Sequence, residues 1–368
     1  MTDTPTIVQP GATIGLLGGG QLARMLSLAA APLGYRCHIF DPGANAPASH
    51  VSAAHTRAAF DDEEALARFG DSVDVVSFEF ESVPARTAQI LSDHVLVRPN
   101  AHAFAIAQDR LLEKTFVNEK ADAPTAPFAP VDNLESLKAA MAALGLPAVL
   151  KTRREGYDGK GQVIIRAESE AQAALQAIKN APAILEAFVP FEREASVVIA
   201  RSASGELAPF DLVENIHENH ILSRTLAPAR LDPAIAQDAQ DMAGRIADAL
   251  DYIGVLAVEF FIETDGSLRV NEIAPRVHNS GHWTIEACYP SKFEQHIRAI
   301  TGLPLGDPAR HSDAEMDNLI GADVNGWPQL VAEPRAHLHL YGKSEVRPGR
   351  KMGHVTRLYP LGERPERA

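Results

Sequence analysis

Apolar and polar positions along the first hundred residues alternate in the manner of strands and helices that follow one another. Four apolar runs have the length and composition of buried strands, at 12–18, 35–41, 73–81 and 95–99. Between the first two runs, the apolar positions over 21–34 recur at helical spacing. Strands separated by helices favour a parallel, doubly wound sheet, so this region is predicted to be an α/β domain.

After the first hundred residues, the pattern changes to helices and paired strands. Helices are predicted over 105–120 and 133–145, with an extended, proline-spaced connector at 121–130 between them. Strands at 147–151 and 163–166 flank a glycine-rich turn, which together with the helices predicts a small α+β lobe. The remaining predicted elements are strands at 183–189 and 193–200, a helix over 233–252, a strand pair over 255–273 and strand-like runs such as 337–341.

Composition places the chain among ordinary globular proteins, with 46% hydrophobic and 22% charged residues. Its 368 residues suggest two or three compact units, at about 150 residues per domain. The formal net charge of −14 argues against a nucleic-acid partner, which needs a basic face. A local basic pocket is still compatible with a phosphorylated small molecule.

Two further features concern the compartment in which the protein works. Cys37 and Cys288 match no disulfide framework or metal-ligand spacing, so both are expected in the core. The N-terminus shows no basic segment followed by an apolar stretch, and no apolar run approaches the roughly 20 residues that span a bilayer. We therefore expect a cytoplasmic protein with no membrane partner.

A glycine-rich turn follows the first predicted strand. Gly18-Gly19-Gly20-Gln21-Leu22-Ala23 fits the pattern G-x-G-x-x-A between a strand and a helix, and Asp41 ends the next strand. Such glycines let the backbone approach a phosphate at a helix N-terminus. The pattern specifies a phosphate rather than the rest of a ligand. A nicotinamide or flavin site, another phosphate ligand and a tight turn without a ligand all remain open at this point.

A second glycine-rich turn follows Lys151, which ends an apolar strand. The segment Gly156-Tyr157-Asp158-Gly159-Lys160-Gly161 has three glycines in six positions, as in a mobile loop whose N–H groups fold over phosphates. It is not a P-loop, because no G-K-[S/T] opens a helix. A solvent-exposed hairpin also uses Gly and Asp, but the neighbouring Arg153 and Arg154 favour phosphate binding.

Two glutamates are predicted to face each other across a hairpin. Asp265-Gly266 is a strong two-residue turn signal, and such a turn pairs Thr264 with Ser267 and Glu259 with Glu272. Cross-strand Cβ atoms are about 4.5–5.5 Å apart, where like charges are destabilising. A magnesium ion would compensate, since it prefers one or two carboxylates together with nucleotide phosphates. The alternative is a solvated edge hairpin, which the apolar residues on both sides of Glu259 disfavour.

A lysine-bearing strand, a glycine lid and an acidic hairpin ending in Asn-Glu together resemble the ATP-grasp enzymes. The full set of motifs is similar to the 5-(carboxyamino)imidazole ribonucleotide synthetases, the ATP-dependent carboxylases of bacterial and fungal purine synthesis. This resemblance covers roughly residues 12–358, with Ala23 where a glycine is frequent. The motifs that carry it are GGGQL at 18–22, FEFE at 78–81, GYDGKGQ at 156–162, NEIAPRVHNSGHWT at 271–284 and RPGRKMGH at 347–354.

The resemblance implies an α/β and α+β architecture, namely an ATP-grasp fold between a Rossmann-like domain and a small β-rich domain. It also implies a homodimeric ligase that uses ATP and Mg²⁺ to carboxylate 5-aminoimidazole ribonucleotide with bicarbonate. The expected units are a pre-ATP-grasp domain at 1–104, the small ATP-grasp lobe with the lid at 105–182, the large lobe at 183–305 and the C-terminal domain at 306–368.

The resemblance also assigns expected roles to individual residues. For ATP these are Arg110 and Lys151 at the phosphates, Gly156, Tyr157, Asp158, Gly159, Lys160, Gly161 and Gln162 in the lid, Glu186, Ala187, Phe188 and Val189 in the adenine hinge, Glu194 at the ribose, and His217 and Asn271 as further contacts. Glu259 and Glu272 resemble the magnesium ligands, and Arg276, His278 and Asn279 resemble the bicarbonate pocket. The ribonucleotide would contact Gly20, Gln21, Leu22, Glu79, Glu81, Tyr157 and Asp158, with its phosphate held by Lys343 and Arg350.

In the chemistry that the resemblance implies, bicarbonate attacks the γ-phosphate of ATP and forms carboxyphosphate. Carboxyphosphate, or carbon dioxide released from it, then meets the exocyclic amine of the ribonucleotide. A closing lid excludes water from this labile intermediate. Asp158 on the lid is a candidate to orient the amine or accept its proton, and its alternative is a turn Asp that caps its own backbone. His278 is a candidate anion ligand, and its alternative is a buried core histidine.

Three other functions remain as alternatives. A sibling ATP-grasp enzyme, such as a biotin carboxylase or a formate-dependent transformylase, is disfavoured by the short tail that ends near RPGRKMGH. A nicotinamide dehydrogenase rests only on residues 18–41 and leaves the second glycine turn unexplained. A non-catalytic nucleotide-binding regulator has no need of both the acidic pair and the PRVHN segment.

Overall fold

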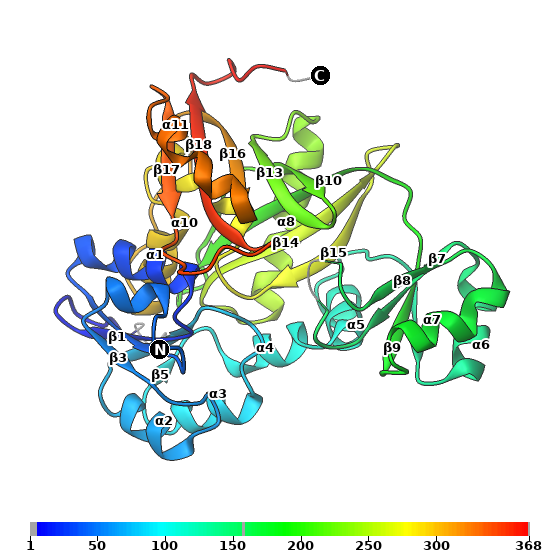
Figure 1. The fold of residues 1–368 in the computed structure, drawn as a ribbon, viewed down its shortest axis with the longest axis horizontal. Coiled ribbons are helices and arrows are strands. Elements are labelled where there is room, and N and C mark those ends of the chain that lie inside the picture. The colour runs from blue at the N-terminus through cyan, green and yellow to red at the C-terminus, as the bar shows by residue number, and fades with distance from the viewer. Residues whose placement is uncertain (1–5, 157–158, 367–368) are drawn as a thin grey trace.

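The structure, a computed structural model, describes residues 6–156 and 159–366 and contains three β-sheets (Figure 1). The first sheet belongs to the N-terminal region, the second to a small lobe at one side of the molecule, and the third occupies the middle and the C-terminal region.

The N-terminal sheet is parallel throughout, with the strand order β3-β2-β1-β4-β5, which confirms the α/β prediction. The short strand β3 was not predicted, and β4 ends at Phe78, so that Glu79 and Glu81 lie beyond the strand. The strands are β1 Thr13–Leu17, β2 Arg36–Phe40, β3 Ala54–Thr56, β4 Val75–Phe78 and β5 Leu96–Val97. The helices are α1 Gln21–Ala30, α2 Glu63–Gly70 and α3 Ala85–Ser92, with 3₁₀ turns at Ala31–Leu33 and Pro47–His50.

The predicted helix over 105–120 is wrong as a single element, because two helices meet there. Helix α4 spans Ala101–Ala107, and α5 spans Arg110–Lys120. Asp109 between them has extended backbone angles, and its carboxylate accepts hydrogen bonds from the backbone of Leu111 and Leu112. An N-cap of this kind starts a new helix, so Asp109 ends the first one.

The small lobe is an antiparallel four-stranded sheet with the order β6-β9-β7-β8, as the α+β prediction requires. The predicted extended connector ends in its edge strand β6. The elements of this lobe are β6 Phe128–Val131, α6 Leu134–Leu144, β7 Ala148–Thr152, β8 Gln162–Ile165, a 3₁₀ turn Glu168–Glu170, α7 Ala171–Ala177 and β9 Ala183–Ala187.

The third sheet has nine strands in the path β15-β14-β10-β12-β13-β16-β18-β17, with β11 beside β10. It continues across residue 305, where the large lobe and the C-terminal domain were expected to meet, and those domain bounds stay a prediction. Its strands are β10 Phe191–Arg201, β11 Leu207–Pro209, β12 Val213–Glu218, β13 Ile221–Ala227, β14 Gly254–Glu263, β15 Leu268–Ala274, β16 Asp313–Ile320, β17 Ala336–Leu340 and β18 Lys351–Tyr359. The helices of this region are α8 Pro233–Ala249, α9 Thr284–Ala287, α10 Lys292–Thr301 and α11 Trp327–Val331, with 3₁₀ turns at Asn279–Gly281 and Gly321–Gly326.

The β14–β15 hairpin brings Glu259 opposite Glu272 as predicted, although its turn differs from the prediction. The backbone N–H of Glu263 donates to Ser267, so the predicted pairing of Thr264 with Ser267 is wrong and the loop is one residue longer. A β-bulge then restores the predicted register, because Phe260 pairs with Val270 while Glu259 pairs with Glu272. The extra residue in this bulge is Asn271.

Helix α10 joins the N-terminal sheet to the large sheet. The ring of His296 accepts a hydrogen bond from the backbone N–H of Val255 at 3.0 Å, and its Nε2 lies 2.8 Å from the hydroxyl of Ser77 on β4. Arg98 donates to the carbonyl of Ile300 at 2.9 Å. One apolar core also runs through both regions, from Leu16 and Leu26 to Phe293 and Ile297, so the two sheets are held as one body.

Candidate functional site

The N–H groups of the first glycine turn face carboxylates of this chain. Gly19 donates to Asp41 at 2.9 Å, Gly20 donates to Glu79, and Leu22 donates to Glu79 at 3.0 Å. A Cβ atom at Gly20 would lie 2.2 Å from Glu79 Oε1, so the glycine is needed for the carboxylate to approach. Burial raises the pKa of Glu79. Because Asp41 and Glu79 accept the hydrogen bonds of these N–H groups, the turn does not offer them to a dinucleotide pyrophosphate.

Glu81 lies beyond the end of β4 and forms an ion pair with Arg276. The guanidinium binds both oxygens of Glu81, with Nη2 at 3.2 Å from Oε1, and its Nη1 donates to the carbonyl of Val277 at 3.3 Å. Burial alone would raise the pKa of Glu81, but Arg276 outweighs it and lowers that pKa. The predicted ribonucleotide residue Glu81 and the predicted bicarbonate residue Arg276 are therefore direct neighbours.

Two buried lysines share Glu186. Lys151 on β7 lies 2.9 Å from Oε2 of Glu186, and Lys114 on α5 lies 3.4 Å from the same oxygen. Burial alone would raise the pKa of Glu186, but the two lysines lower it to about 2. Sequence reasoning missed Lys114, although it stands one helical turn after Arg110, on the same face of α5. The side chain of Glu186 thus orients lysines, while its backbone pairs within the small sheet.

Arg110 joins the lid to the acidic hairpin. Its Nη1 lies 3.0 Å from Oε2 of Glu272, and its Nη2 donates to the carbonyl of Gly156 at 3.1 Å. The base of the lid is fixed to the start of α5 by Asp109, whose carboxylate binds Arg153 through two hydrogen bonds of 3.0 and 2.8 Å. Arg153 and Arg154 therefore serve as anchors for the lid, since Arg154 also lies 3.4 Å from Asp109.

The lid itself is only partly described, because Tyr157 and Asp158 lie outside the described residues. Gly159 has φ of 75° and Gly161 has φ of 74°, a backbone region that favours glycine. A Cβ atom at Gly159 would lie 2.6 Å from the side chain of His220, in the turn between β12 and β13. The lid residue Gly159 therefore packs against the large sheet. Lys160 and Gln162 follow in the chain, and Gln162 begins β8.

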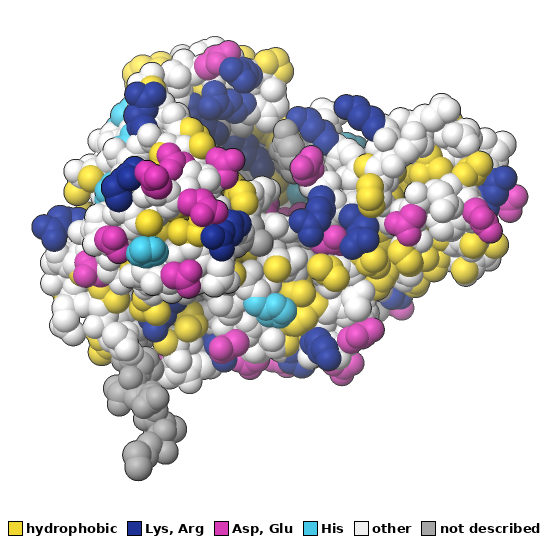
Figure 2. All heavy atoms as spheres, turned by 90° about the horizontal axis from the view of Figure 1, so that it is seen from below, with side chains coloured by type: hydrophobic (Ala, Val, Ile, Leu, Met, Phe, Trp, Pro, Cys, Tyr) yellow, Lys and Arg dark blue, Asp and Glu magenta, His cyan; other side chains and the backbone are white. Residues whose placement is uncertain are grey.

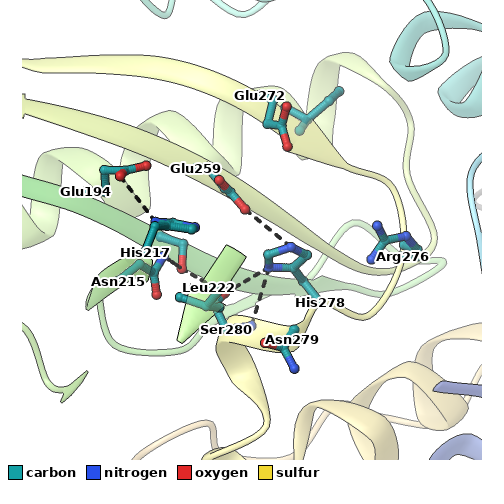
Figure 3. Close-up of polar contacts among 12 residues, drawn as sticks. Glu194, Asn215, His217, Leu222, Glu259, Glu272, Arg276, His278, Asn279 and Ser280 are labelled. Carbon is teal, nitrogen blue, oxygen red and sulfur yellow. Dashed lines mark hydrogen bonds and ion pairs between the residues drawn. The ribbon is translucent and has the colours of Figure 1, made fainter. Parts of the chain in front are cut away.

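Glu259 and Glu272 lie on the same face of the large sheet, and each pairs with a different ionisable side chain (Figure 3). Glu272 pairs with Arg110, and Glu259 Oε1 lies 3.2 Å from His278 Nε2. Burial and Glu272 raise the pKa of Glu259 to about 8, against smaller effects of His217 and Lys351. Burial, followed by the charges of Arg276 and Lys292, lowers the pKa of His278 well below its usual value.

His217 lies 3.2 Å from Glu194 on the neighbouring strand. Burial alone would lower the pKa of His217, but Glu194 outweighs it and raises that pKa. The predicted adenine hinge, 186–189, begins in the last two residues of β9. There the N–H of Ala187 donates to the carbonyl of Pro127 at 2.8 Å and the N–H of Phe188 to that of Pro147 at 3.3 Å.

Asn279 is engaged in a reciprocal amide pair with Asn318. The two side chains donate to each other at 2.9 and 2.6 Å, and Asn318 also donates to the carbonyl of Leu222 at 2.9 Å. Only 9% of Asn279 is exposed. The structure therefore places Asn279 beside His278 but directs its amide to β16 rather than toward Glu259.

The basic loop between β17 and β18 lies near the first glycine turn. A Cβ atom at Gly342 would lie 3.9 Å from the guanidinium of Arg24 on α1. Burial and Arg350 lower the pKa of Lys343 to about 8, and the charge of Glu79 opposes this shift. Lys343 donates to the carbonyl of Lys351 at 2.7 Å, and Arg350 donates to that of Glu345 at 2.9 Å. Figure 2 shows Lys and Arg side chains gathered around the hollow between the body and the small lobe.

The residues around Glu259 and Glu272 fit a nucleotide with a magnesium ion. Glu186 Oε1 and Asn271 Oδ1 are buried and have no hydrogen-bond partner in the described structure. The two facing carboxylates carry a repulsion that a cation relieves, and hard oxygen ligands suit Mg²⁺. Among the described residues there is no group of three or more His, Cys, Asp or Glu side chains that would hold a metal alone. This donor set suits an ion whose other ligands are phosphates and water.

No helix in the described part of the chain has the length and apolar character required to cross a membrane.

Comparison with known proteins gives three matching domain families. The chain matches the ribonucleotide synthetase preATP-grasp domain over residues 11–108, the ATP-grasp domain over 116–293 and the phosphoribosylaminoimidazole carboxylase C-terminal domain over 314–363. It is 52% identical over 357 residues to the N5-carboxyaminoimidazole ribonucleotide synthase of Brucella melitensis, covering 96% of this chain and 98% of that one.

Solved structures give the same result. An N5-carboxyaminoimidazole ribonucleotide synthetase in its ADP complex has a TM-score of 0.93 and 43% identity, covering 98% of this chain and 94% of that one. The N5-carboxyaminoimidazole synthase of Aspergillus clavatus, in complex with ADP and 5-aminoimidazole ribonucleotide, has a TM-score of 0.89 and 32% identity, covering 95% and 94%.

Glu113 allows a prediction on stability. It is buried on α5 and accepts a hydrogen bond from the backbone of Ile273, and burial followed by Glu272 raises its pKa to about 8. The folded protein thus binds a proton that the unfolded chain releases above about pH 4.5, so Glu113 lowers stability as the pH rises from about 4.5 to 8. Glu113→Gln should reduce this fall by roughly 3 kcal/mol between pH 4.5 and 7.

Urea unfolding of both proteins across this pH range measures the difference. Glu119→Gln is the control, because Glu119 is an exposed carboxylate on the same helix. Parallel pH profiles for the wild-type protein and Glu113→Gln would contradict the prediction.

Proposed function

Because the chain belongs to the family of N5-carboxyaminoimidazole ribonucleotide synthases, we propose specific roles in that reaction for the residues around Glu259 and Glu272. The protein is an ATP-grasp ligase, and it converts 5-aminoimidazole ribonucleotide to its N5-carboxy derivative with ATP in purine biosynthesis. The observation that carries the assignment of roles is the facing carboxylate pair, bordered by Arg110 on one side and His278 on the other.

The nucleotide binds between the small sheet and the large sheet. Arg110 and Lys151 contact its phosphates, the lid residues from Gly156 to Gln162 cover them, and the segment Glu186–Val189 contacts the adenine. Glu194 binds the ribose, and His217 and Asn271 add contacts. Two buried lysines near an unpartnered carboxylate oxygen and an unpartnered amide oxygen support this placement.

Glu259 and Glu272 hold the magnesium ion, which when bound offsets charge on the transferring phosphoryl group. Arg276 holds bicarbonate beside these carboxylates in a pocket that His278 borders, and Asn279 fixes the segment that carries His278 through its pair with Asn318. Arg276 is the side chain suited to a planar oxyanion, because its guanidinium donates two parallel hydrogen bonds. Glu81 occupies this edge of the guanidinium with the same bidentate geometry, which supports the fit of the edge to a carboxylate-like group.

The ribonucleotide binds between the first glycine turn and the basic loop. Its imidazole ring is lined by Glu79, Glu81, Gly20, Gln21 and Leu22. Its phosphate is held by Lys343 and Arg350. The low pKa of Lys343 reflects a partly buried cationic pair, which an anion would relieve. Tyr157 and Asp158 of the lid complete this side.

The reaction then proceeds in two transfers. A bicarbonate oxygen attacks the γ-phosphorus of ATP, the bond to the β-phosphate oxygen breaks, and ADP leaves. The exocyclic amine of the ribonucleotide attacks the carboxyl carbon of carboxyphosphate, phosphate leaves with the electron pair, and the amine loses a proton to Asp158. Arg110 and the lysines stabilise the phosphoryl charge, and the closed lid keeps water from the intermediate.

The compartment and the assembly belong to the same proposal. The family's biosynthetic role supports a cytoplasmic enzyme that acts on small molecules, and the resemblance supports a homodimer. Light scattering of the purified protein measures the assembly directly.

The test of the function is ADP release by the purified protein. Turnover should require ATP, Mg²⁺, bicarbonate and 5-aminoimidazole ribonucleotide together, since the site holds groups for each. Full activity without ATP, or hydride transfer to a nicotinamide, would overturn the assignment.

Glu272→Gln should abolish most magnesium-dependent turnover while the fold survives. The neutral isostere removes an oxygen anion from the ion and also removes the repulsion with Glu259, which offsets the loss of the ion pair with Arg110, so the protein without nucleotide should melt close to the wild type. Activity as a function of Mg²⁺ and thermal melting measure both effects. Glu263→Gln is the control on the same hairpin, where the glutamate pairs with Arg269, and unchanged activity of Glu272→Gln at low Mg²⁺ would show that the pair does not bind the ion.

Arg350→Ala should weaken ribonucleotide binding by roughly 1.5–3 kcal/mol, the scale of a charge-assisted hydrogen bond, with little change for ATP. Calorimetric titration of both ligands into the variant measures the two affinities. Arg347→Ala is a matched control in the same loop, because the exposed Arg347 pairs with Glu345. Equal losses for both ligands would indicate a folding defect, and an unchanged ribonucleotide affinity would remove Arg350 from the site.

A further inference from the structure

A row of small polar side chains crosses the large sheet behind the carboxylate pair. The ladder places Ser196 on β10 opposite Glu259 on β14, and Asn215 on β12 opposite Thr225 on β13. Residues paired in this way present their side chains on the same face. Ser196 and Thr225 are fully buried, and Asn215 is 4% exposed. These side chains therefore have only each other and their immediate neighbours as hydrogen-bond partners.

The row forms a continuous chain of hydrogen bonds with a definite direction. Thr225 donates to Asn215 Oδ1 at 3.3 Å, which leaves the amide nitrogen of Asn215 to donate to Ser196 Oγ at 2.8 Å. Ser196 donates in turn to Ser280 Oγ at 2.8 Å. Ser280 is also fully buried, so its own hydroxyl hydrogen is left for the next acceptor.

That acceptor is the imidazole of His278. Ser280 Oγ lies 3.0 Å from His278 Nδ1, and the backbone N–H of Ser280 points at the same nitrogen at 3.4 Å (Figure 3). Two donors aimed at Nδ1 require a lone pair there. In a neutral imidazole the hydrogen then resides on Nε2, which lies 3.2 Å from Glu259 Oε1.

We propose that Asn215, Ser196 and Ser280 are positioning residues that hold His278 in the neutral tautomer with hydrogen on Nε2, so that His278 donates to Glu259. This proposal rests on the proposed function, because it explains how a magnesium ligand is oriented from behind. In the opposite tautomer the Nε2 lone pair would face the carboxylate and repel it. A carboxylate fixed by a hydrogen bond from a second residue presents a constant geometry to a bound ion.

Nitrogen NMR reads the tautomer directly. Protein labelled with ¹⁵N in histidine gives separate long-range signals for protonated and unprotonated ring nitrogens, and His278→Gln identifies the signal of His278 by its loss. The wild-type protein should show a protonated Nε2 and an unprotonated Nδ1. A protonated Nδ1 in the wild-type protein would overturn the proposal.

Two serine variants test the chain of hydrogen bonds that leads to His278. Ser280→Ala removes the hydroxyl donor, and Ser196→Ala frees the hydroxyl of Ser280 to accept from Nδ1 instead of donating to it. Both should move the His278 signals toward the other tautomer and lower kcat for ribonucleotide- and bicarbonate-dependent ADP release about tenfold, while KM for ATP stays within about twofold. Ser202→Ala is the control, because Ser202 is a buried serine directly after β10 whose hydrogen bonds within the described residues are local, to Ser204 and Glu206.

The outcomes separate the two proposals. A wild-type protein without ribonucleotide-dependent turnover would overturn the proposed function, while the NMR signals would still report the tautomer. If the wild-type protein is active but the His278 tautomer and kcat are unchanged in both serine variants, the positioning role of the serines is overturned and the proposed function stands. A loss of kcat with an unchanged tautomer would also overturn that role, since the serines would then act only through packing.

Discussion

The repulsion between two carboxylates that a β-ladder holds opposite each other constrains the structure around them. Backbone hydrogen bonds fix Glu259 and Glu272 in register, so neither can withdraw without breaking the sheet. Each is instead met by a different group: Arg110 from the start of α5 for Glu272, and His278 from the segment after β15 for Glu259. A neutral histidine donates a hydrogen bond but cancels no charge, and burial together with Glu272 raises the pKa of Glu259 to about 8. The remaining repulsion favours a bound cation.

The first glycine turn shows how one backbone geometry serves two different chemistries. A strand, a glycine turn and a helix N-terminus present N–H groups to any anion, whether it is a ligand phosphate or a carboxylate of the chain. Here Glu79 takes the N–H groups of Gly20 and Leu22, and Asp41 takes that of Gly19. The turn is thereby converted from a pyrophosphate cradle into a support that holds Glu79 at the end of the parallel sheet. The motif alone does not distinguish these cases, because the competing carboxylate comes from 57 residues further along the chain.

Periodicity and turn signals predicted most of the fold, whereas residues joined only by tertiary contacts were missed. The parallel sheet, the small lobe and the acidic hairpin follow from local patterns. The prediction that Glu259 faces Glu272 was correct, although the predicted turn was wrong. The observed turn is one residue longer, and the bulge at Asn271 shifts the register back in the opposite direction. Lys114 had a helical-spacing signal, and Asp109 had the signal of an N-cap inside a predicted helix. Ser196 and Ser280 had none, because single hydroxyls 84 residues apart carry no spacing pattern.

The two antiparallel sheets carry different residues of the site, and helix α5 contacts both sheets. The large sheet carries the acidic hairpin, and through its continuation into β16, β18 and β17 it also carries the basic loop after β17. The small sheet carries Lys151 and Glu186. Two side chains of α5 contact both parts: Arg110 binds Glu272 and the lid carbonyl of Gly156, and Lys114 binds Glu186 and the carbonyl of Asn271. Any separation of the sheets breaks these charged contacts, so the position of the lid and the electrostatics of the carboxylate pair change together.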